Sequence, residues 1–171
     1  MLGPSSLPAL QLSLSRDKLE TMHDFLQGGY SVNQMLSELF RDLSALPQVE
    51  AIALGGSRAT GRCDETSDYD VYVYLTNAVA ESQRRTILEK YCGYLEIGNT
   101  FWELEDDVTL KNGIDMDIIY RNLEDFAKGI SSVVDDCNAW NGYTTCMWHN
   151  LLTCKILYDQ DGRLADRKSV V

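Results

Sequence analysis

Long apolar runs are missing from the sequence, and this absence sets the first limit on what the protein can be. No stretch approaches the roughly 18 apolar residues that a membrane-spanning helix needs. Residues 1–14 contain several leucines, but they have no basic start and no continuous apolar centre, so they are not typical of a signal peptide. We therefore expect no association with a membrane.

Cysteines are too few and too irregularly placed to form a structural framework. There are five of them, an odd number, and no two are spaced as Cys-x-x-Cys. Disulfide-rich domains and zinc centres both depend on regular cysteine spacings, so neither is expected. Free thiols are typical of the cytoplasm, which is the location that we predict.

Basic residues are also scarce. Lys and Arg number 15 against 26 Asp and Glu, so the net charge is −11, and the longest basic run is the pair Arg84-Arg85. A protein that holds long DNA or RNA neutralises its phosphates with Lys and Arg. We therefore expect no long nucleic acid as a partner. The acidic field would instead attract a cationic small molecule.

The apolar residues that are present predict a single domain that mixes helices and strands. Helices are predicted over residues 15–26, 31–46, 81–95, 123–133 and 143–152, and strands over 49–54, 71–75, 108–111, 114–120 and 155–158. Asn112-Gly113 stands between two of these strands and is a strong signal for a hairpin turn. Residues 159–162 are predicted to form a turn. The fold class is therefore α+β, with a mixed α/β sheet.

The segment LGGSRATGRCDETSDYDVYV, residues 54–73, carries the most chemical information. A buried strand leads into Gly55-Gly56-Ser57, and Asp68 and Asp70 stand at the start of the next strand. Side chains alternate faces along a strand, so the two aspartates point the same way. Two neighbouring carboxylates repel each other unless a cation lies between them. Mg²⁺ prefers such oxygen ligands, together with substrate phosphates.

The glycines before this pair are suited to binding phosphate. Gly55 and Gly56 let the backbone approach a ligand closely, and exposed N–H groups with the Ser57 hydroxyl would bind phosphate oxygens. Arg58 is a further candidate for contact with the triphosphate. One loop thus offers phosphate donors and the next strand offers metal ligands, which is what phosphoryl or nucleotidyl transfer requires.

The same segment resembles the signature of the DNA polymerase beta-like nucleotidyltransferase superfamily, Gly-Ser followed by Asp-x-Asp after about ten residues. Here ten residues separate Ser57 from Asp68. The flanking residues look most like those of the small bacterial members, which include aminoglycoside- and lincosamide-modifying and minimal nucleotidyltransferases. The resemblance covers residues 31–163. It implies a mixed sheet with helices packed on one side and a catalytic domain over residues 15–171, without the C-terminal helical domain of larger relatives. Residues 1–14, which include Pro4 and Pro8, are expected to form an N-terminal arm.

The resemblance also implies a third carboxylate on a later strand. The run IDMDIIYR, residues 114–121, supplies two aspartates on one strand face. Asp117 is the better match by position, and Asp115 is the reserve. Asp117 is flanked by Met116 and Ile118, where an uncompensated carboxylate would be costly.

The expected reaction is the transfer of a nucleoside monophosphate from a nucleoside triphosphate to a hydroxyl of a small, cationic acceptor, with release of pyrophosphate. By the resemblance, two Mg²⁺ ions are held by Asp68, Asp70 and Asp117, and the triphosphate is held by Gly55, Gly56, Ser57 and Arg58. Two alternatives remain open at this point. One is an antitoxin or regulatory module of the same fold that acts on a protein partner, and the other is a nucleotide-binding domain without transfer activity.

An acidic cluster, Glu103, Glu105, Asp106 and Asp107, precedes the hairpin. We interpret it as a solvated loop. The alternative is a wall that attracts the cationic acceptor, with Trp102 stacking on a ring of that acceptor.

Overall fold

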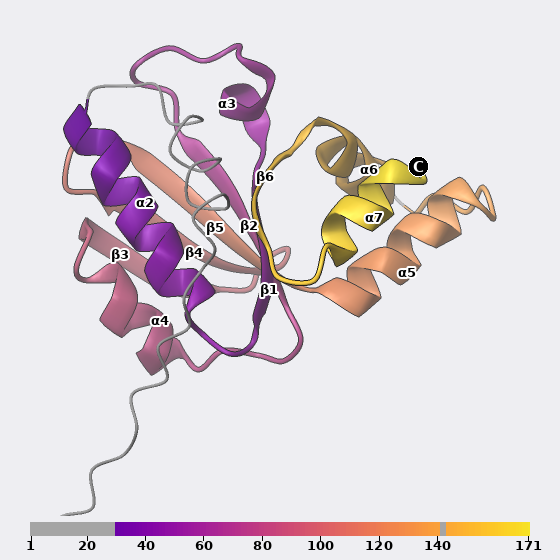
Figure 1. Cartoon of the computed structure of the whole chain (residues 1–171), viewed down its shortest axis with the longest axis horizontal. Coiled ribbons are helices and arrows are strands. Elements are labelled where there is room, and N and C mark those ends of the chain that lie inside the picture. The colour runs from indigo at the N-terminus through magenta and orange to yellow at the C-terminus, as the bar shows by residue number, and fades with distance from the viewer. Residues whose placement is uncertain (1–29, 141–142) are drawn as a thin grey trace, which may run out of the picture.

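The computed structural model describes residues 30–140 and 143–171. Within them one mixed sheet has the strand order β3-β4-β5-β2-β1-β6. The strands are β1 (Val49–Leu54), β2 (Tyr69–Leu75), β3 (Cys92–Asn99), β4 (Leu104–Leu110), β5 (Asp115–Asn122) and β6 (Lys155–Asp159). The helices are α2 (Tyr30–Ser44), α3 (Gly56–Thr60), α4 (Glu81–Leu88), α5 (Leu123–Val134), α6 (Tyr143–Thr153) and α7 (Arg163–Ser169). The mixed α+β class is confirmed (Figure 1).

The predictions for the chain before residue 30, an arm and a helix over residues 15–26, lie outside the described residues. No helix in the described part of the chain is long and apolar enough to cross a membrane.

The strand order places β5 and β2 at the centre of the sheet, and they are the one parallel pair among the described strands. The other neighbouring strands pair antiparallel. The hairpin between β4 and β5 closes at Asn112-Gly113 as predicted, where Gly113 has a φ of +85° that favours glycine. The parallel pair brings the starts of β2 and β5 to the same edge of the sheet, and that edge carries the predicted aspartates.

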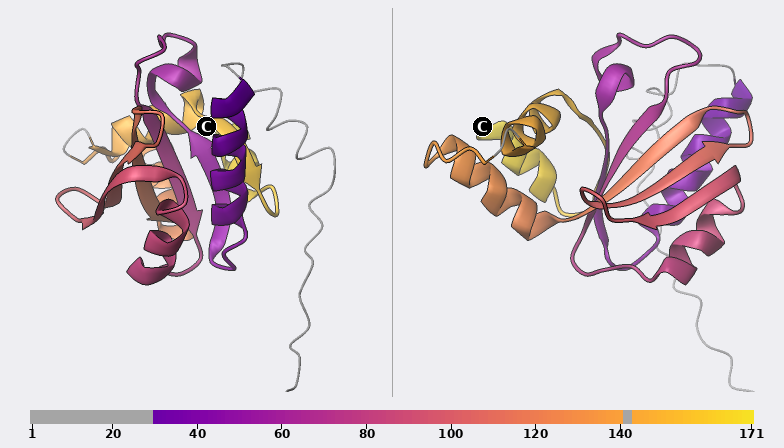
Figure 2. Two further views of the ribbon diagram at one scale, coloured as in Figure 1. Left: turned by 90° about the vertical axis from the view of Figure 1, so that its left-hand side faces the viewer. Right: turned by 180° about the vertical axis from the view of Figure 1, so that it is seen from behind.

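Helices cover both faces of the sheet, so the prediction of helices on one side only was wrong (Figure 2). On one face, α2 and α4 pack Leu36, Leu39 and Leu88 against the strands. On the other, α5, α6 and α7 pack Phe126, Ile130 and other side chains against β1 and β2. The reason lies in β1, whose six residues are all buried, because a strand that is apolar on both faces needs cover on both sides.

The second face is covered only in part. Its buried cluster takes sheet residues from β1 and β2, and among the described residues it includes none from β3 or β4. There the same face carries polar side chains instead, from Glu105, Asp107 and Thr109 on β4. A polar sheet surface is thus left beside the helices α5, α6 and α7.

Two predicted segments differ from the structure near the edge strand β3. The helix predicted over residues 81–95 ends at Leu88, and β3 begins at Cys92. Leu95 and Ile97 alternate with the exposed Glu96 and pack on the first face, which is the period of a strand. The helix α7, at the end of the chain, was not predicted.

The acidic cluster is not a solvated loop, and that prediction was wrong. Its residues lie at or on β4, where Asp106 is fully buried and paired with Arg84. Glu103, just before β4, accepts hydrogen bonds from Arg121 with both carboxylate oxygens. Glu105 and Asp107 point to the opposite face from Asp106. Strand formation therefore divides the cluster between two faces of the sheet.

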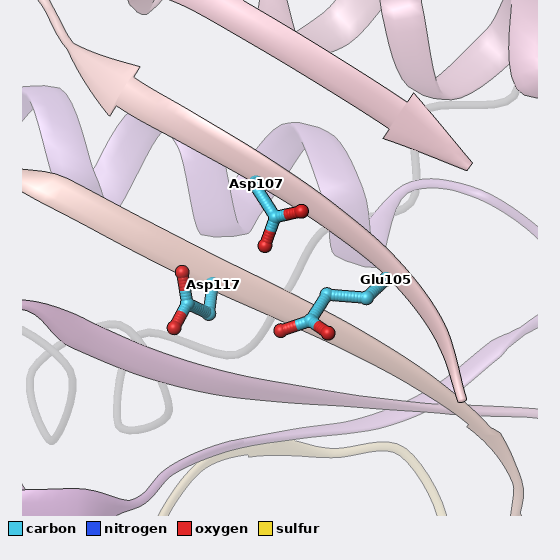
Figure 3. Close-up of side chains that lie close together, drawn as sticks. All are labelled: Glu105, Asp107 and Asp117. Carbon is cyan, nitrogen blue, oxygen red and sulfur yellow. The ribbon is translucent and has the colours of Figure 1, made fainter. Parts of the chain in front are cut away.

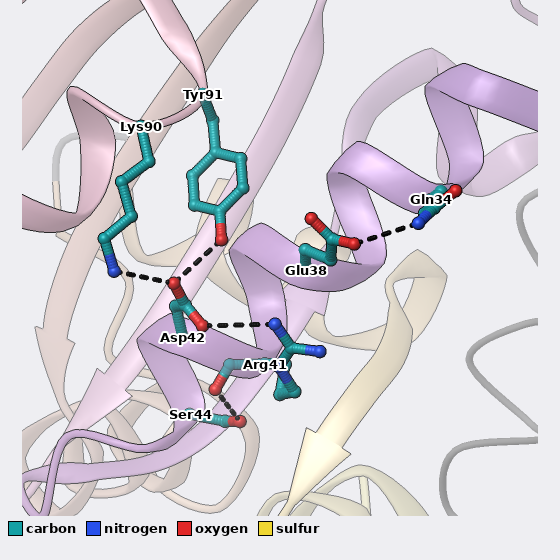
Figure 4. A network of polar contacts seen from close by, with 7 residues as sticks. All are labelled: Gln34, Glu38, Arg41, Asp42, Ser44, Lys90 and Tyr91. Atoms are coloured by element: carbon teal, nitrogen blue, oxygen red, sulfur yellow. Dashed lines mark hydrogen bonds and ion pairs between the residues drawn. The ribbon is translucent and has the colours of Figure 1, made fainter.

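A polar network anchors α2 to the connection between α4 and β3 (Figure 4). The Asp42 carboxylate accepts hydrogen bonds from Lys90 Nζ at 2.9 Å and from Tyr91 Oη at 2.8 Å. Arg41 contacts the same carboxylate from one residue away in the helix. Burial acts to raise the pKa of Asp42, but the two hydrogen bonds together hold it below its usual value. The network thus helps to fix the helix that covers the first face.

Candidate active site

The phosphate-loop candidate begins where β1 ends. The chain passes from Leu54 through Gly55 into the short helix α3, and the Gly55 N–H donates to the Asp70 carbonyl at 2.8 Å. Gly56 has a φ of +59°, and a Cβ atom at this position would collide with the Asp70 carboxylate. Glycine is therefore required here for two reasons, its backbone conformation and the close approach of Asp70.

The predicted aspartate pair stands at the beginning of β2. Asp68 is exposed, just before the strand, and Asp70 is half-buried as its second residue. Burial, and then the charge of Asp68, raise the pKa of the Asp70 carboxyl. Both effects penalise the ionised carboxylate in the metal-free protein, and a bound cation would relieve them.

The third carboxylate lies directly beside this pair. In the parallel pairing of β2 with β5, Asp117 is the partner of Asp70. Asp117 is half-buried, and its pKa is raised to about 6, first by burial and then by the carboxylates of Asp107 and Asp70. Asp115 lies two residues before Asp117 in β5, is exposed, and accepts a hydrogen bond from Thr109 Oγ1 at 2.7 Å. The register therefore favours Asp117 over Asp115 as the neighbour of Asp70.

Two further carboxylates join Asp117 from β4, and the sequence did not assign them to the site (Figure 3). Asp107 is the strand partner of Asp117, and Glu105 is two residues away on the same face. One carboxylate oxygen from each of Glu105, Asp107 and Asp117 lies within 4.8 Å of the others. The Asp107 Oδ2 atom also accepts a hydrogen bond from Asn99 Nδ2 at 3.2 Å. The alternation of the acidic cluster along a strand was the signal that could have found them.

Arg58 supports the loop itself. Its guanidinium donates to the main-chain carbonyls of Ser67 and Asp68 and lies 3.9 Å from the centre of the Tyr69 ring. These contacts tie α3 to the residues that carry the aspartate pair. Arg58 therefore fixes the backbone just before β2, where Asp68 lies. Its contact with a triphosphate stays a prediction.

The donor set fits a divalent metal ion of the magnesium type. The candidate ligands are carboxylate oxygens alone, which such a cation prefers. Among the described residues, neither Asp70 nor Asp117 forms an ion pair with Lys or Arg. Burial and neighbouring carboxylates raise the pKa of both. Of the three predicted ligands, Asp117 lies in a group of carboxylates close enough to share an ion, together with Glu105 and Asp107. The parts of Asp68 and Asp70 as ligands stay predictions.

Comparison with known proteins identifies the family. Residues 36–139, more than half of the chain, match the nucleotidyltransferase domain family. The chain belongs to this family, and the superfamily predicted from the Gly-Ser and Asp-x-Asp motifs is confirmed. The match spans both motifs and Asp117. A comparison with curated protein sequences gives no significant match.

Solved structures similar to the chain include three nucleotide-adding enzymes. A non-canonical poly(A) polymerase complex is 14% identical with a TM-score of 0.41, over 80% of this chain and 48% of that one. A CCA-adding enzyme with CTP is 14% identical with a TM-score of 0.46, over 90% and 34%. A cytoplasmic RNA terminal U-transferase is 16% identical with a TM-score of 0.37, over 62% and 35%. The chain thus spans between a third and a half of each of these proteins.

Proposed function

We propose that the chain transfers a nucleoside monophosphate from a nucleoside triphosphate to an acceptor hydroxyl, with release of pyrophosphate. The observation that carries this proposal is the pairing of Asp70 with Asp117 across β2 and β5, with Gly56 packed against the Asp70 carboxylate. This arrangement supports the proposal because carboxylates suited to a metal ion lie next to a backbone suited to phosphate. Enzymes that transfer phosphoryl or nucleotidyl groups act mainly by neutralising the charge of the phosphates and by positioning the reactants.

The residues have separate parts in this reaction. The N–H groups and the hydroxyl of Gly56 and Ser57 bind the triphosphate oxygens. Asp68, Asp70 and Asp117 would hold two Mg²⁺ ions, which when bound neutralise the triphosphate and favour ionisation of the acceptor hydroxyl. Asp117, with a pKa of about 6 before any metal binds, is ionised at neutral pH and can accept the proton of that hydroxyl.

The acceptor in this proposal is small and cationic. A row of acidic residues crosses neighbouring strands of the open sheet face, because Asp70 pairs with Asp117, Asp117 with Asp107, and Asp107 with Glu96. With strands about 4.8 Å apart, the row is about 14 Å long. Among the described residues, neither Glu96, Glu105 nor Asp107 forms an ion pair with Lys or Arg. This surface suits an acceptor with several amino groups.

The first test is pyrophosphate release by the purified protein with Mg²⁺ and each of the four ribonucleoside triphosphates. Each triphosphate is combined with an acceptor panel of amino sugars, polyamines, neutral sugars and a short RNA. The proposal expects release with an amine-bearing hydroxyl compound and none without an acceptor. Release with the RNA alone would keep the transfer reaction but replace the acceptor class. No release in any combination would contradict the proposal.

A further inference from the structure

A buried ion pair lies directly behind the carboxylates of β4. Arg84, from α4, binds the Asp106 carboxylate at 2.7 Å, and the side chains are only 4% and 0% exposed. Asp106 stands between Glu105 and Asp107 in the strand, so its side chain points to the first face while theirs point to the open face. Whatever fixes Asp106 therefore also fixes the direction of Asp107.

The pair connects α4 to three strands. The Asp106 Oδ1 atom also accepts the Gly98 N–H of β3 at 2.9 Å. The Arg84 guanidinium lies 4.8 Å from the centre of the Tyr120 ring of β5. Next to Gly98, at an irregularity in the β3 pairing, Asn99 turns its side chain to Asp107. Asp106 and Asp107 are thus held on opposite faces by two successive residues of β3.

This arrangement is a poor source of stability. Within the described residues, Arg84 Nε is buried without a hydrogen-bond partner. Burying two charges costs desolvation free energy, and the attraction between them is often too weak to offset that cost. Replacement of such a pair by apolar side chains is therefore often neutral or stabilising. Such a pair can instead fix the orientation of the strands that it connects.

We propose that Arg84 and Asp106 are positioning residues that hold the Asp107 carboxylate between Asn99 and Asp117. The inference rests on the proposed function, because it gives a role to the strand that completes that site. The pair acts through β4 and does not touch the reacting groups. Asp107 in turn helps to place the acceptor beside Asp117, so loss of the pair should affect turnover more than triphosphate binding.

The test replaces both partners with apolar side chains, Arg84→Met together with Asp106→Leu, in the full chain. The melting temperature is expected to stay close to that of the unmodified protein, because removal of two buried charges is favourable while the Gly98 N–H loses its acceptor. The kcat for an amine-bearing acceptor found in the pyrophosphate assay is expected to fall about tenfold, and the KM for the triphosphate to change less than twofold. Gln83→Met, an exposed substitution next to Arg84 in α4, is the matched control and should change neither value.

A second readout does not depend on activity. The side-chain amide signals of Asn99 in a nitrogen-15 NMR spectrum report its hydrogen bond to Asp107, and Asp107→Ala gives their position without that bond. In the double variant these signals should move toward the Asp107→Ala position. If the double variant does not fold, Arg84→Lys, which keeps the charge but not the guanidinium, should move them in the same direction.

The outcomes separate the two proposals. A folded double variant with unchanged Asn99 signals and unchanged kcat would overturn the positioning role. If the unmodified protein transfers no nucleotide, the proposed function fails. The Asn99 signals then still decide whether Arg84 and Asp106 position Asp107.

Discussion

Gly56 is the residue at which the sequence motif and the site geometry meet most closely. Its φ of +59° and its contact with Asp70 both exclude a side chain. We expect Gly56→Ala to lower transfer activity by about 100-fold, because the added methyl group would displace the Asp70 carboxylate. Substitutions of residues that only support a metal ligand already lower activity by about 10–100-fold. Gly61→Ala is the matched control: its φ is +71°, but no atom lies within 4 Å of the added Cβ. Comparable melting temperatures and unequal activities would support the assignment, and equal activities would contradict it.

The ionised Asp70 carboxylate destabilises the metal-free protein, because burial and the neighbouring Asp68 both raise its pKa. We expect Asp70→Asn to abolish most of the activity, by about 100-fold or more. The same substitution should raise the melting temperature without metal, since it removes a repelling charge. Thermal unfolding with and without Mg²⁺ tests both points. Mg²⁺ should stabilise the unmodified protein more than the variant, and equal stabilisation would remove Asp70 from the metal site.

Asp117 and Asp115 share a strand face, but the structure gives them different surroundings. Asp117 pairs with Asp70, whereas Asp115 is exposed and bonded to Thr109. We therefore expect Asp117→Ala to abolish transfer and to leave triphosphate binding largely intact. Asp115→Ala should cost about tenfold or less, which is about 1.4 kcal/mol on the barrier. Titration calorimetry with a non-hydrolysable triphosphate, run beside turnover, ranks the two. The reverse ranking would move the role to Asp115.

At the scale of single elements, the attachment of α2 gives a prediction about pH. The folded-state pKa of Asp42 is lowered, so its carboxylate stabilises the fold at pH values above its unfolded pKa of about 3.9. That stability is lost as the pH falls through the lower, folded-state pKa. Urea unfolding of the unmodified protein and of Asp42→Asn should therefore differ at pH 7, and the difference should shrink as the pH falls below the unfolded pKa of about 3.9. A difference that does not shrink with falling pH would contradict this role of Asp42.

The elements that could be predicted from the sequence are those with strong local signals. The apolar run of β1 and the Asn112-Gly113 hairpin depend on neighbouring residues, and both are present. The glycines after β1 begin the short helix α3, which was not predicted. The strand β3 could not be predicted in this way, because its start follows α4 without a proline or a turn motif. Its identity depends on pairing with β4, a contact between distant residues.

The same distinction applies to the site. The Asp68 and Asp70 pair and the loop before it are close in sequence, so their spacing alone indicated a metal and a phosphate. Glu105 and Asp107 enter the site only because β4 lies next to β5 in the sheet. Without the strand register, their charges resembled those of an ordinary solvated loop. The polar open face of the sheet is likewise a property of the assembled strands.

At the scale of the whole molecule, the net charge of −11 bears on the choice of acceptor. Attraction between an acidic surface and a cationic acceptor is screened by salt, with a screening length of about 10 Å at 0.1 M. We expect the KM for an amine-bearing acceptor to rise several-fold between 0.05 and roughly 0.5 M salt. A neutral acceptor of the same size is the control and should show little change. A KM for the amine that does not depend on salt would contradict the role of the acidic row.

The same net charge predicts weak binding to nucleic acids. Duplex DNA and structured RNA at physiological salt should bind no better than non-specifically, because few cations are present to replace their counterions. A gel-shift titration with a transfer RNA tests this expectation. Submicromolar binding would overturn the small-acceptor assignment and leave the transfer chemistry in place.

The central claim, that the carboxylates around Asp70 and Asp117 support nucleotidyl transfer, is tested most directly by following the phosphorus atoms. The triphosphate that gives pyrophosphate release is labelled either at the α- or at the γ-phosphate and incubated with the acceptor and Mg²⁺. We expect the α-label to appear in the acceptor and the γ-label in pyrophosphate, and Asp70→Asn to abolish both. A γ-label in the acceptor, or α-label transfer that survives Asp70→Asn, would contradict it.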